Sequence, residues 1–179
     1  MKKKISNKIL MLIALLAMLI SVVITLGIVF DPFENNDPLY VSGKTLFVKI
    51  YEPVKYDSVD YSLVNSSGDI YNIKSSENRE IILIDIEITN GASSEIRFNV
   101  DEKAADLLSL TGYTYYPVNP SNGSKITDYN DLYGYPIWGQ YILKQNEKLK
   151  GFLIFMVDKK ISPKRFNWLA SDNVLIYLD

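Results

Sequence analysis

The fold of this chain is decided by residues 79–89, which read REIILIDIEIT. In an extended chain, every second side chain points to the same face. One face then carries Ile82, Ile84, Ile86 and Ile88, and the other carries Leu83, Asp85, Glu87 and Thr89. Alternation this strict over eight residues predicts a half-buried antiparallel strand, because the apolar residues of a helix recur every three to four positions instead.

The same period of two recurs on both sides of this strand. Asn90-Gly91 comes directly after it, a pair that tolerates the positive φ of a tight turn. Further strands are expected at 44–51, 69–74, 96–100, 113–116, 140–143, 149–157, 165–169 and 173–178. Residues 101–110 fit either a short helix or a strand, and residues 117–136 are expected to be irregular. Eight to nine short strands separated by turn residues predict an all-β antiparallel sandwich.

The first thirty residues predict a membrane anchor. Four lysines precede residues 9–30, a run of 22 positions without a charge or a proline. As a helix this run would be about 33 Å long, enough to cross a hydrocarbon core of about 30 Å. Its length and the lack of a small-residue cleavage site favour an uncleaved anchor over a removed signal peptide. Because the lysines lie upstream, the N-terminus is expected to stay in the cytoplasm.

These features divide the chain into four segments. They are a cytoplasmic basic tip at 1–8, a transmembrane helix at 9–30 in contact with the lipid bilayer, a linker at 31–40 and an extracytoplasmic β domain at 41–179. Of the 19 lysines and arginines, four precede the apolar run, which leaves 15 against all 21 acidic residues and a net charge of −6 beyond it. Such a balance argues against nucleic acid as a partner.

Two motifs carry a resemblance to a known family. The first is the alternating strand that ends in Asn and leads into small polar residues, IILIDIEITNGASSEIRFNV at 81–100, and the second is LKQNEKLKGFLIFMVD at 143–158. From Arg79 onward the chain resembles immunoglobulin-like extracytoplasmic domains of unknown function that occur in prokaryotic lipoproteins and anchored surface proteins. The family's Pro-Gly turn is Gln145-Asn146 here. The resemblance implies an immunoglobulin-like sandwich at the cell surface and no particular reaction.

The composition argues against an enzyme. The chain contains no histidine and no cysteine, which removes the commonest general base, metal ligand and nucleophilic thiol. Ser124-Lys125 and Ser162-Pro163-Lys164 are expected in surface loops, and the acidic stretch 128–131 lacks the glycine and glutamate of a calcium loop. We therefore predict no catalytic residue, no metal and no cofactor, with a carboxylate-dependent hydrolase as the less favoured alternative.

Aromatic residues are concentrated near the irregular segment. Eight of the chain's 22 aromatic residues lie between positions 113 and 141. Tyr and Trp combine a large rigid ring with a polar tip, which suits recognition surfaces. The candidate binding residues are Tyr129, Tyr133, Tyr135, Trp138 and Tyr141. They could bind a glycan, a partner protein or the membrane interface, or they could cover an open end of the sandwich core.

Two Asn-x-Ser sequons, at Asn65 and Asn122, are candidate glycosylation sites because both fall in predicted turns. The function that these observations favour is non-catalytic binding, or a structural role, of a membrane-anchored module at the cell envelope. An accessory subunit of a membrane or surface-filament assembly is the alternative.

Overall fold

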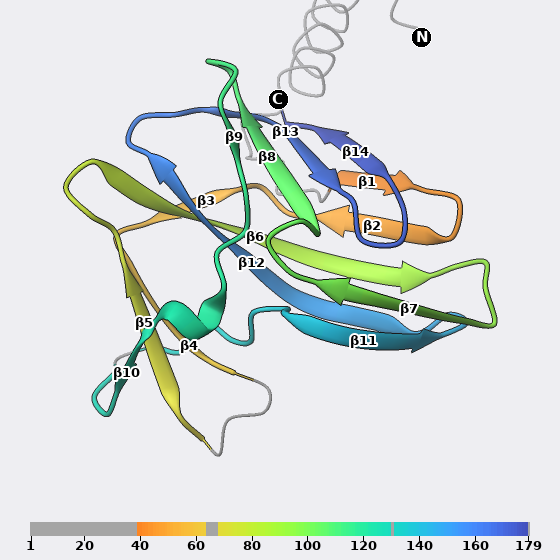
Figure 1. The fold of residues 1–179 in the computed structure, drawn as a ribbon, viewed down its shortest axis with the longest axis horizontal. Coiled ribbons are helices and arrows are strands. Elements are labelled where there is room, and N and C mark those ends of the chain that lie inside the picture. Colours follow the sequence, from red (N-terminus) through yellow and green to blue (C-terminus); the bar gives the residue numbers. More distant parts are fainter. Residues whose placement is uncertain (1–38, 64–67, 130, 179) are drawn as a thin grey trace, which may run out of the picture. The chain divides into compact units, whose positions relative to one another are not determined.

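The computed structural model describes residues 39–63, 68–129 and 131–178 (Figure 1). Across these residues the chain forms fourteen β-strands and one short 3-10 helix, so the prediction of an all-β fold is confirmed. The basic tip, the membrane helix expected at 9–30, most of the linker and Asn65 lie outside the described residues. Within the described ranges, no helix has the length and apolar character needed to cross a membrane.

A five-stranded antiparallel sheet, called sheet A here, forms the centre of the fold. Its two longest strands pair with each other over eleven consecutive residue pairs. They are β6 (Arg79–Asn90) and β12 (Lys148–Asp158). The other edge of β6 pairs with β2 (Leu46–Ile50) and β3 (Val54–Tyr56), and β1 (Leu39–Ser42) pairs with β2.

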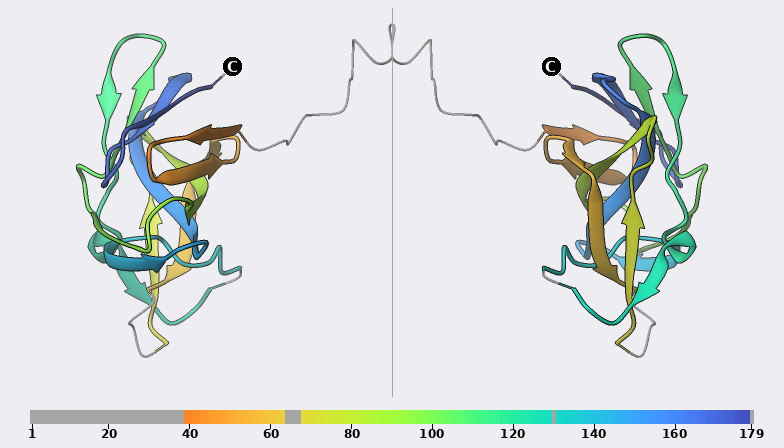
Figure 2. Two further views of the ribbon diagram at one scale, coloured as in Figure 1. Left: turned by 90° about the vertical axis from the view of Figure 1, so that its right-hand side faces the viewer. Right: turned by 90° about the vertical axis from the view of Figure 1, so that its left-hand side faces the viewer.

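Three smaller sheets surround sheet A. The first contains β4 (Ser58–Ser62), β5 (Ile70–Lys74) and β10 (Ser124–Ile126), and the second contains β7 (Glu95–Val100) and β11 (Gly139–Lys144). The third contains β8 (Ala105–Ser109), β9 (Thr114–Tyr115), β13 (Pro163–Trp168) and β14 (Val174–Tyr177), and the helix is η1 (Pro120–Asn122). The β4–β5–β10 group lies at one end of the domain and the β8–β9–β13–β14 group at the other (Figures 1 and 2).

Two hydrophobic cores lie on opposite faces of sheet A. The larger core includes Ile82, Ile84, Ile86, Ile88, Leu153, Phe155, Phe166 and Trp168. The smaller core consists of Val59, Tyr61, Ile73, Ile81, Leu83, Phe152 and Ile154. The predicted alternation along β6 is therefore correct. The strand expected to be half-buried is buried on both faces over residues 81–84, because β4 and β5 pack over its second face.

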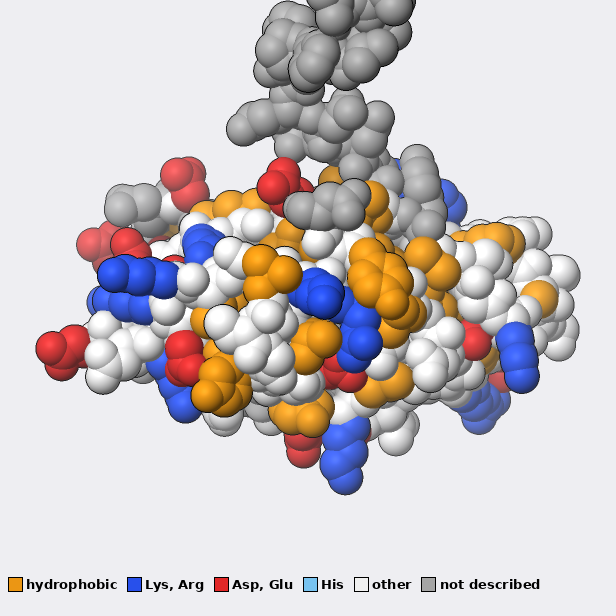
Figure 3. Space-filling view, turned by 90° about the horizontal axis from the view of Figure 1, so that it is seen from above, with side chains coloured by type: hydrophobic (Ala, Val, Ile, Leu, Met, Phe, Trp, Pro, Cys, Tyr) orange, Lys and Arg blue, Asp and Glu red, His pale blue; other side chains and the backbone are white. Residues whose placement is uncertain are grey.

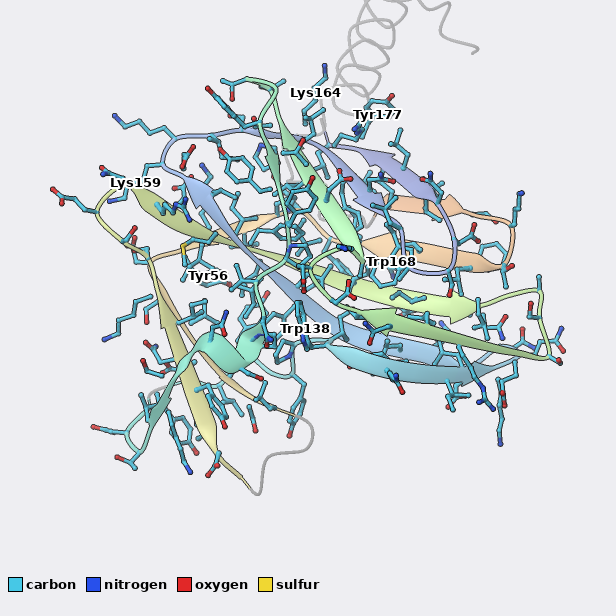
Figure 4. The ribbon with its side chains drawn as sticks, viewed as in Figure 1. Tyr56, Trp138, Lys159, Lys164, Trp168 and Tyr177 are labelled. Carbon is cyan, nitrogen blue, oxygen red and sulfur yellow. The ribbon has the colours of Figure 1, made fainter. Side chains whose placement is uncertain are left out.

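The larger core is closed by aromatic contacts. Trp168, at the end of β13, is fully buried, and its ring meets Phe98 of β7 edge-on with 6.0 Å between ring centroids (Figure 4). Its indole N–H donates a hydrogen bond of 2.9 Å to the carbonyl oxygen of Ala170, so the polar end of this large ring is satisfied. This contact joins the β7–β11 and β13–β14 groups over sheet A.

Several elements differ from the sequence-based expectation in type or number. Residues 105–109, which fitted a helix or a strand, form β8 because they pair with β13. The short strands β1, β3, β4 and β10 were not expected, and β1 begins within the predicted linker. The segment 117–136 is mostly irregular, as predicted, apart from η1 and β10, and backbone hydrogen bonds near its start and directly after its end hold it to β12. Val118 N–H donates to the carbonyl oxygen of Ile154 at 2.8 Å, and Ile137 N–H donates to that of Phe152 at 3.0 Å.

Candidate binding site

The five aromatic residues proposed from the sequence do not form one cluster. Tyr133 and Tyr135 border the same surface hollow, and Tyr129 is exposed without lining it. Trp138 directly precedes β11 and Tyr141 lies within it, and the Trp138 backbone N–H donates a 3.0 Å hydrogen bond to the Tyr141 hydroxyl. The Tyr141 ring packs on Phe98, with 5.9 Å between ring centroids. The structure thus separates Tyr133 and Tyr135, which share a hollow, from Tyr141, which packs against the larger core, and from Trp138, whose backbone bonds to Tyr141.

Another tyrosine of the aromatic region lies away from the hollow. Tyr113, at the turn between β8 and β9, has 65% of its surface exposed, and Leu110 in the same turn is equally exposed. Figure 3 views the domain from this side and shows hydrophobic side chains interspersed with basic and acidic ones. Tyr113 is therefore a useful control position for experiments on the hollow.

The hollow has a volume of ≈ 340 Å³ and lies on the outer face of sheet A. Its floor is formed by the paired backbones of β6 and β12 around Ile86 and Gly151. We call it the tyrosine groove and define it by the six side chains that give it chemical character: Tyr51, Tyr133, Tyr135, Asp85, Glu87 and Lys150. It occurs where the cover from β4 and β5 ends, so the second face of β6 changes there from the buried Leu83 to the partly exposed Asp85 and the lysine-paired Glu87.

The segment that carries Tyr133 and Tyr135 is held in place from both sides. Tyr133 N–H donates to the carbonyl oxygen of Asp60 at 2.9 Å, and Ser62 N–H donates to that of Gly134 at 3.1 Å, which ties the segment to β4. On the other side, the segment approaches β12 so closely that a Cβ atom on Gly151 would lie 2.6 Å from the Tyr135 carbonyl oxygen. A glycine at 151 is therefore what allows this wall of the groove to form.

Tyr133 is fixed by its ring and by its hydroxyl. Its ring meets Phe152 edge-on at 4.9 Å and Tyr56 edge-on at 5.5 Å between centroids. Its hydroxyl donates a 2.9 Å hydrogen bond to Oδ2 of Asp85. Burial of the phenol, followed by the adjacent Asp85 carboxylate, raises the pKa of Tyr133 well above its ordinary value. Tyr133 thus remains a neutral hydrogen-bond donor that orients Asp85.

Glu87 lies at the centre of a charged row on the outer face of sheet A. Lys148 Nζ and Lys150 Nζ each lie 2.8 Å from a Glu87 carboxylate oxygen. These two hydrogen bonds lower the pKa of Glu87 from 4.5 to about 2, although burial of the side chain acts in the opposite direction. Glu87 is therefore ionised and doubly paired, which makes it a fixed acceptor and not a proton donor.

Tyr51 forms the opposite border of the groove, and sequence reasoning did not single it out. The pairing of β6 shifts by one residue between Ile50–Ile86 and Val54–Leu83, so the chain between β2 and β3 contains a bulge. Within this bulge, Tyr51 N–H donates to the Asp85 carbonyl oxygen at 3.0 Å. The Lys49 ammonium lies 5.1 Å from the centroid of the Tyr51 ring, within cation–π range.

Asp85, Glu87 and Lys150 were also missed as site residues. The sequence did contain a signal for this site, namely the carboxylates of Asp85 and Glu87 on one face of an otherwise apolar strand. Charged side chains in such a strand must reach solvent or an oppositely charged partner. Of the two sequons, Asn122 is exposed at the end of η1, and Asn65 lies outside the described residues. Among the described residues, no group of three or more His, Cys, Asp or Glu side chains is arranged to hold a metal ion.

Comparison with known proteins gives structural neighbours only. No family model matches the chain, and no curated protein sequence matches it. Among solved structures, the chain is similar to a "putative lipoprotein (ycdA)" from Bacillus subtilis, with a TM-score of 0.50 and 16% sequence identity. That match covers 78% of this chain and 38% of the Bacillus protein, so the chain corresponds to well under half of its neighbour.

Two further solved structures are smaller proteins. An uncharacterised β-sandwich protein from Clostridium difficile aligns with a TM-score of 0.43 at 12% identity, covering 79% of this chain and 90% of that one. A conserved hypothetical protein from Bacillus anthracis aligns with a TM-score of 0.42 at 14% identity, covering 78% and 92% respectively. At these identities the likeness with the Bacillus subtilis protein concerns the fold alone, a mostly antiparallel β-sandwich.

Proposed function

We propose that this chain is an immunoglobulin-like module, anchored in the cell membrane through residues 9–30, that binds a component of the cell envelope in the tyrosine groove without catalysis. The motifs at 81–100 and 143–158 and the sandwich fold support an immunoglobulin-like relationship. The lysine-flanked apolar run supports the anchor and its orientation. A neighbour described as a lipoprotein is consistent with an extracytoplasmic location.

The tyrosine groove is the observation that carries the binding proposal. Two of its rings keep a large exposed surface, 53% for Tyr135 and 39% for Tyr51, although both are attached to backbone held by hydrogen bonds. Rigid aromatic side chains that remain exposed beside a concave surface are the usual anchors of binding sites, because little conformational entropy is lost when they make contact. A purely structural role gives no reason to hold these rings in solvent.

The charged groups of the domain support binding more than catalysis. Glu87 is held ionised by two lysines, and the Tyr133 hydroxyl is bonded to Asp85, so neither group is poised to exchange a proton near neutral pH. The lysine of the Ser124-Lys125 pair lies 2.7 Å from Asp69 Oδ1, and its pKa is raised by that hydrogen bond. A raised pKa keeps Lys125 protonated, which is unsuitable for a general base.

The proposal is tested with the full-length protein in detergent micelles and purified cell-envelope fragments. Tyr135→Ala is expected to weaken binding by about tenfold or more, as for a central aromatic contact. Tyr113→Ala, which removes a similarly exposed ring (65% against 53% for Tyr135) from the β8–β9 turn, is the control and is expected to bind as the wild type does. Equal binding by wild type and Tyr135→Ala would show that the groove is not the site. Proteolysis of the domain on intact cells tests its location.

A further inference from the structure

The groups around the tyrosine groove carry charges of both signs. Glu87 is compensated by Lys148 and Lys150, and Asp85 accepts a hydrogen bond from the Tyr133 hydroxyl. A third lysine, Lys49, lies over the ring of Tyr51. A strongly anionic ligand would meet two carboxylates, and a strongly cationic ligand would meet ammonium groups on both sides. The groove therefore suits a ligand without net charge.

The polar groups of the groove nevertheless offer donors and acceptors together. Carboxylate oxygens of Asp85 and Glu87 are acceptors, the Lys150 ammonium is a donor, and the tyrosine hydroxyls can serve as either. A ligand that satisfies such a set must itself carry several groups that both donate and accept. Hydroxyl groups have this property, and a polyhydroxylated ligand carries many of them close together.

The exposed faces of the tyrosine rings also restrict the kind of ligand that fits the groove. Tyr51 and Tyr135 border the groove and keep exposed surface available for contact. A sugar ring presents C–H groups on its faces and hydroxyls around its edge, so it can lie on an aromatic ring while its edge bonds to neighbouring polar groups. The volume of ≈ 340 Å³ is at the lower end of the range of about 300–1,000 Å³ for small-molecule sites, which fits a short glycan segment.

The backbone beneath the groove disfavours an extended peptide. A peptide that binds a sheet usually adds a strand to a free edge. The floor of the groove consists of β6 and β12, which pair with each other at Ile86 and Gly151, and β6 is paired on its other side with β2. The wall segment also occupies β12 through the bond from Ile137 N–H to the Phe152 carbonyl oxygen. Recognition in the groove therefore depends on side chains.

We propose that the tyrosine groove binds a segment of a neutral glycan, with Tyr51 and Tyr135 packing on sugar rings and Asp85, Glu87 and Lys150 bonding to hydroxyls. The inference rests on the proposed function, because it names the ligand class of the same site. The proposal makes one specific claim about affinity. The faces of the Tyr51 and Tyr135 rings contribute more to glycan binding than their hydroxyl groups do.

The test titrates the full-length protein with neutral oligosaccharides of N-acetylglucosamine, glucose and mannose, using calorimetry. The detergent has a polyoxyethylene headgroup, since a sugar headgroup would compete for the groove. At least one series is expected to bind. Tyr135→Ala and Tyr51→Ala are expected to weaken that binding by about tenfold, whereas Tyr135→Phe and the control Tyr113→Ala stay within about twofold of wild type.

The failure of this inference is distinguishable from failure of the proposed function. Binding to envelope fragments that depends on Tyr135 but is lost when the fragments are treated with protease identifies a protein partner and overturns the glycan assignment alone. The glycan assignment alone is also overturned if no oligosaccharide binds and the protein still binds envelope fragments from which the glycans have been removed. Absence of any binding to envelope fragments overturns both. Near-UV circular dichroism of each variant confirms that the loss of a ring has not unfolded the domain.

Discussion

Substitution of Glu87 by glutamine provides a quantitative test of the charged row on sheet A. The side chain is largely buried, with 11% of its surface exposed, and it accepts hydrogen bonds from two lysines. Its pKa falls from 4.5 in an unpaired carboxyl to about 2 in the folded domain. Glu87→Gln keeps the size of the side chain and removes the charge, so it isolates the electrostatic contribution.

The magnitude follows from linkage between proton binding and folding. A pKa lowered to this extent corresponds to about 3 kcal/mol of stability if the interaction were fully shielded from water. The side chains of Lys148 and Lys150 are 55% and 70% exposed, so solvent screens the pairs and the expected loss is about 1–2 kcal/mol at neutral pH. That loss corresponds to a decrease of about 3–8 °C in the unfolding midpoint.

The pH dependence has a definite sign. Because the folded-state pKa is the lower one, Glu87 stabilises the domain above pH 4.5, and its contribution disappears as the pH falls towards about 2. The stability difference between wild type and Glu87→Gln is therefore largest at neutral pH and mostly lost near pH 3. Added salt should reduce the difference at neutral pH, since the lysine ends of the pairs are exposed.

Urea unfolding followed by tryptophan fluorescence provides the assay, because Trp168 is fully buried in the folded domain. Glu95→Gln is the matched control, since Glu95 pairs with Arg97 at 3.0 Å on an exposed surface and is expected to contribute less than about 1 kcal/mol. A Glu87→Gln protein as stable as wild type at neutral pH would refute the reasoning. So would a stability difference that is the same near pH 3 as at neutral pH.

Three other substitutions test the groove wall, the larger core and the β1–β2 hairpin by urea unfolding. Gly151→Ala forces its new Cβ against the Tyr135 carbonyl oxygen, so we expect a loss of about 1–3 kcal/mol together with weaker ligand binding; unchanged stability would show that the wall is not tightly apposed. Phe155→Ala in the larger core is expected to cost about 3–5 kcal/mol, against about 1 kcal/mol or less for the exposed Phe47→Ala, and similar costs would contradict the assignment of faces. Asp172→Ala removes the acceptor of two backbone N–H groups at the start of β2, for an expected loss of about 1–3 kcal/mol, and amide exchange there should accelerate.

The strands with the strictest alternation were predictable from sequence. β6 and β12 begin and end within about one residue of the expected limits because their apolar residues leave one extended arrangement. Residues 101–110 could not be assigned, since a run such as Ala104–Leu108 suits a helix or a strand equally well. Pairing with β13, more than fifty residues away, decides between them, and such a contact has no local signature.

The candidate site was only partly accessible to the same reasoning. Tyr133 and Tyr135 stood out because they belong to a tyrosine-rich irregular segment. Tyr51 did not, because its place at the groove depends on a one-residue shift in pairing between β2, β3 and β6. Trp138 looked equivalent in sequence to Tyr135, yet it does not line the groove, and its backbone N–H bonds to the hydroxyl of Tyr141, which packs against the larger core.

The position of β6 and β12 between two cores has a consequence for how the domain responds to a ligand. These two strands contribute side chains to both hydrophobic cores, so they cannot separate without exposing both sets of apolar side chains. We therefore expect them to be the last part of the domain to unfold locally. The floor under the tyrosines belongs to the same strand pair, at the point where the smaller core ends and the larger core lies beneath it. The proposed ligand would therefore meet a preorganised surface, and we expect adjustment on binding to be confined to side-chain rotation above it.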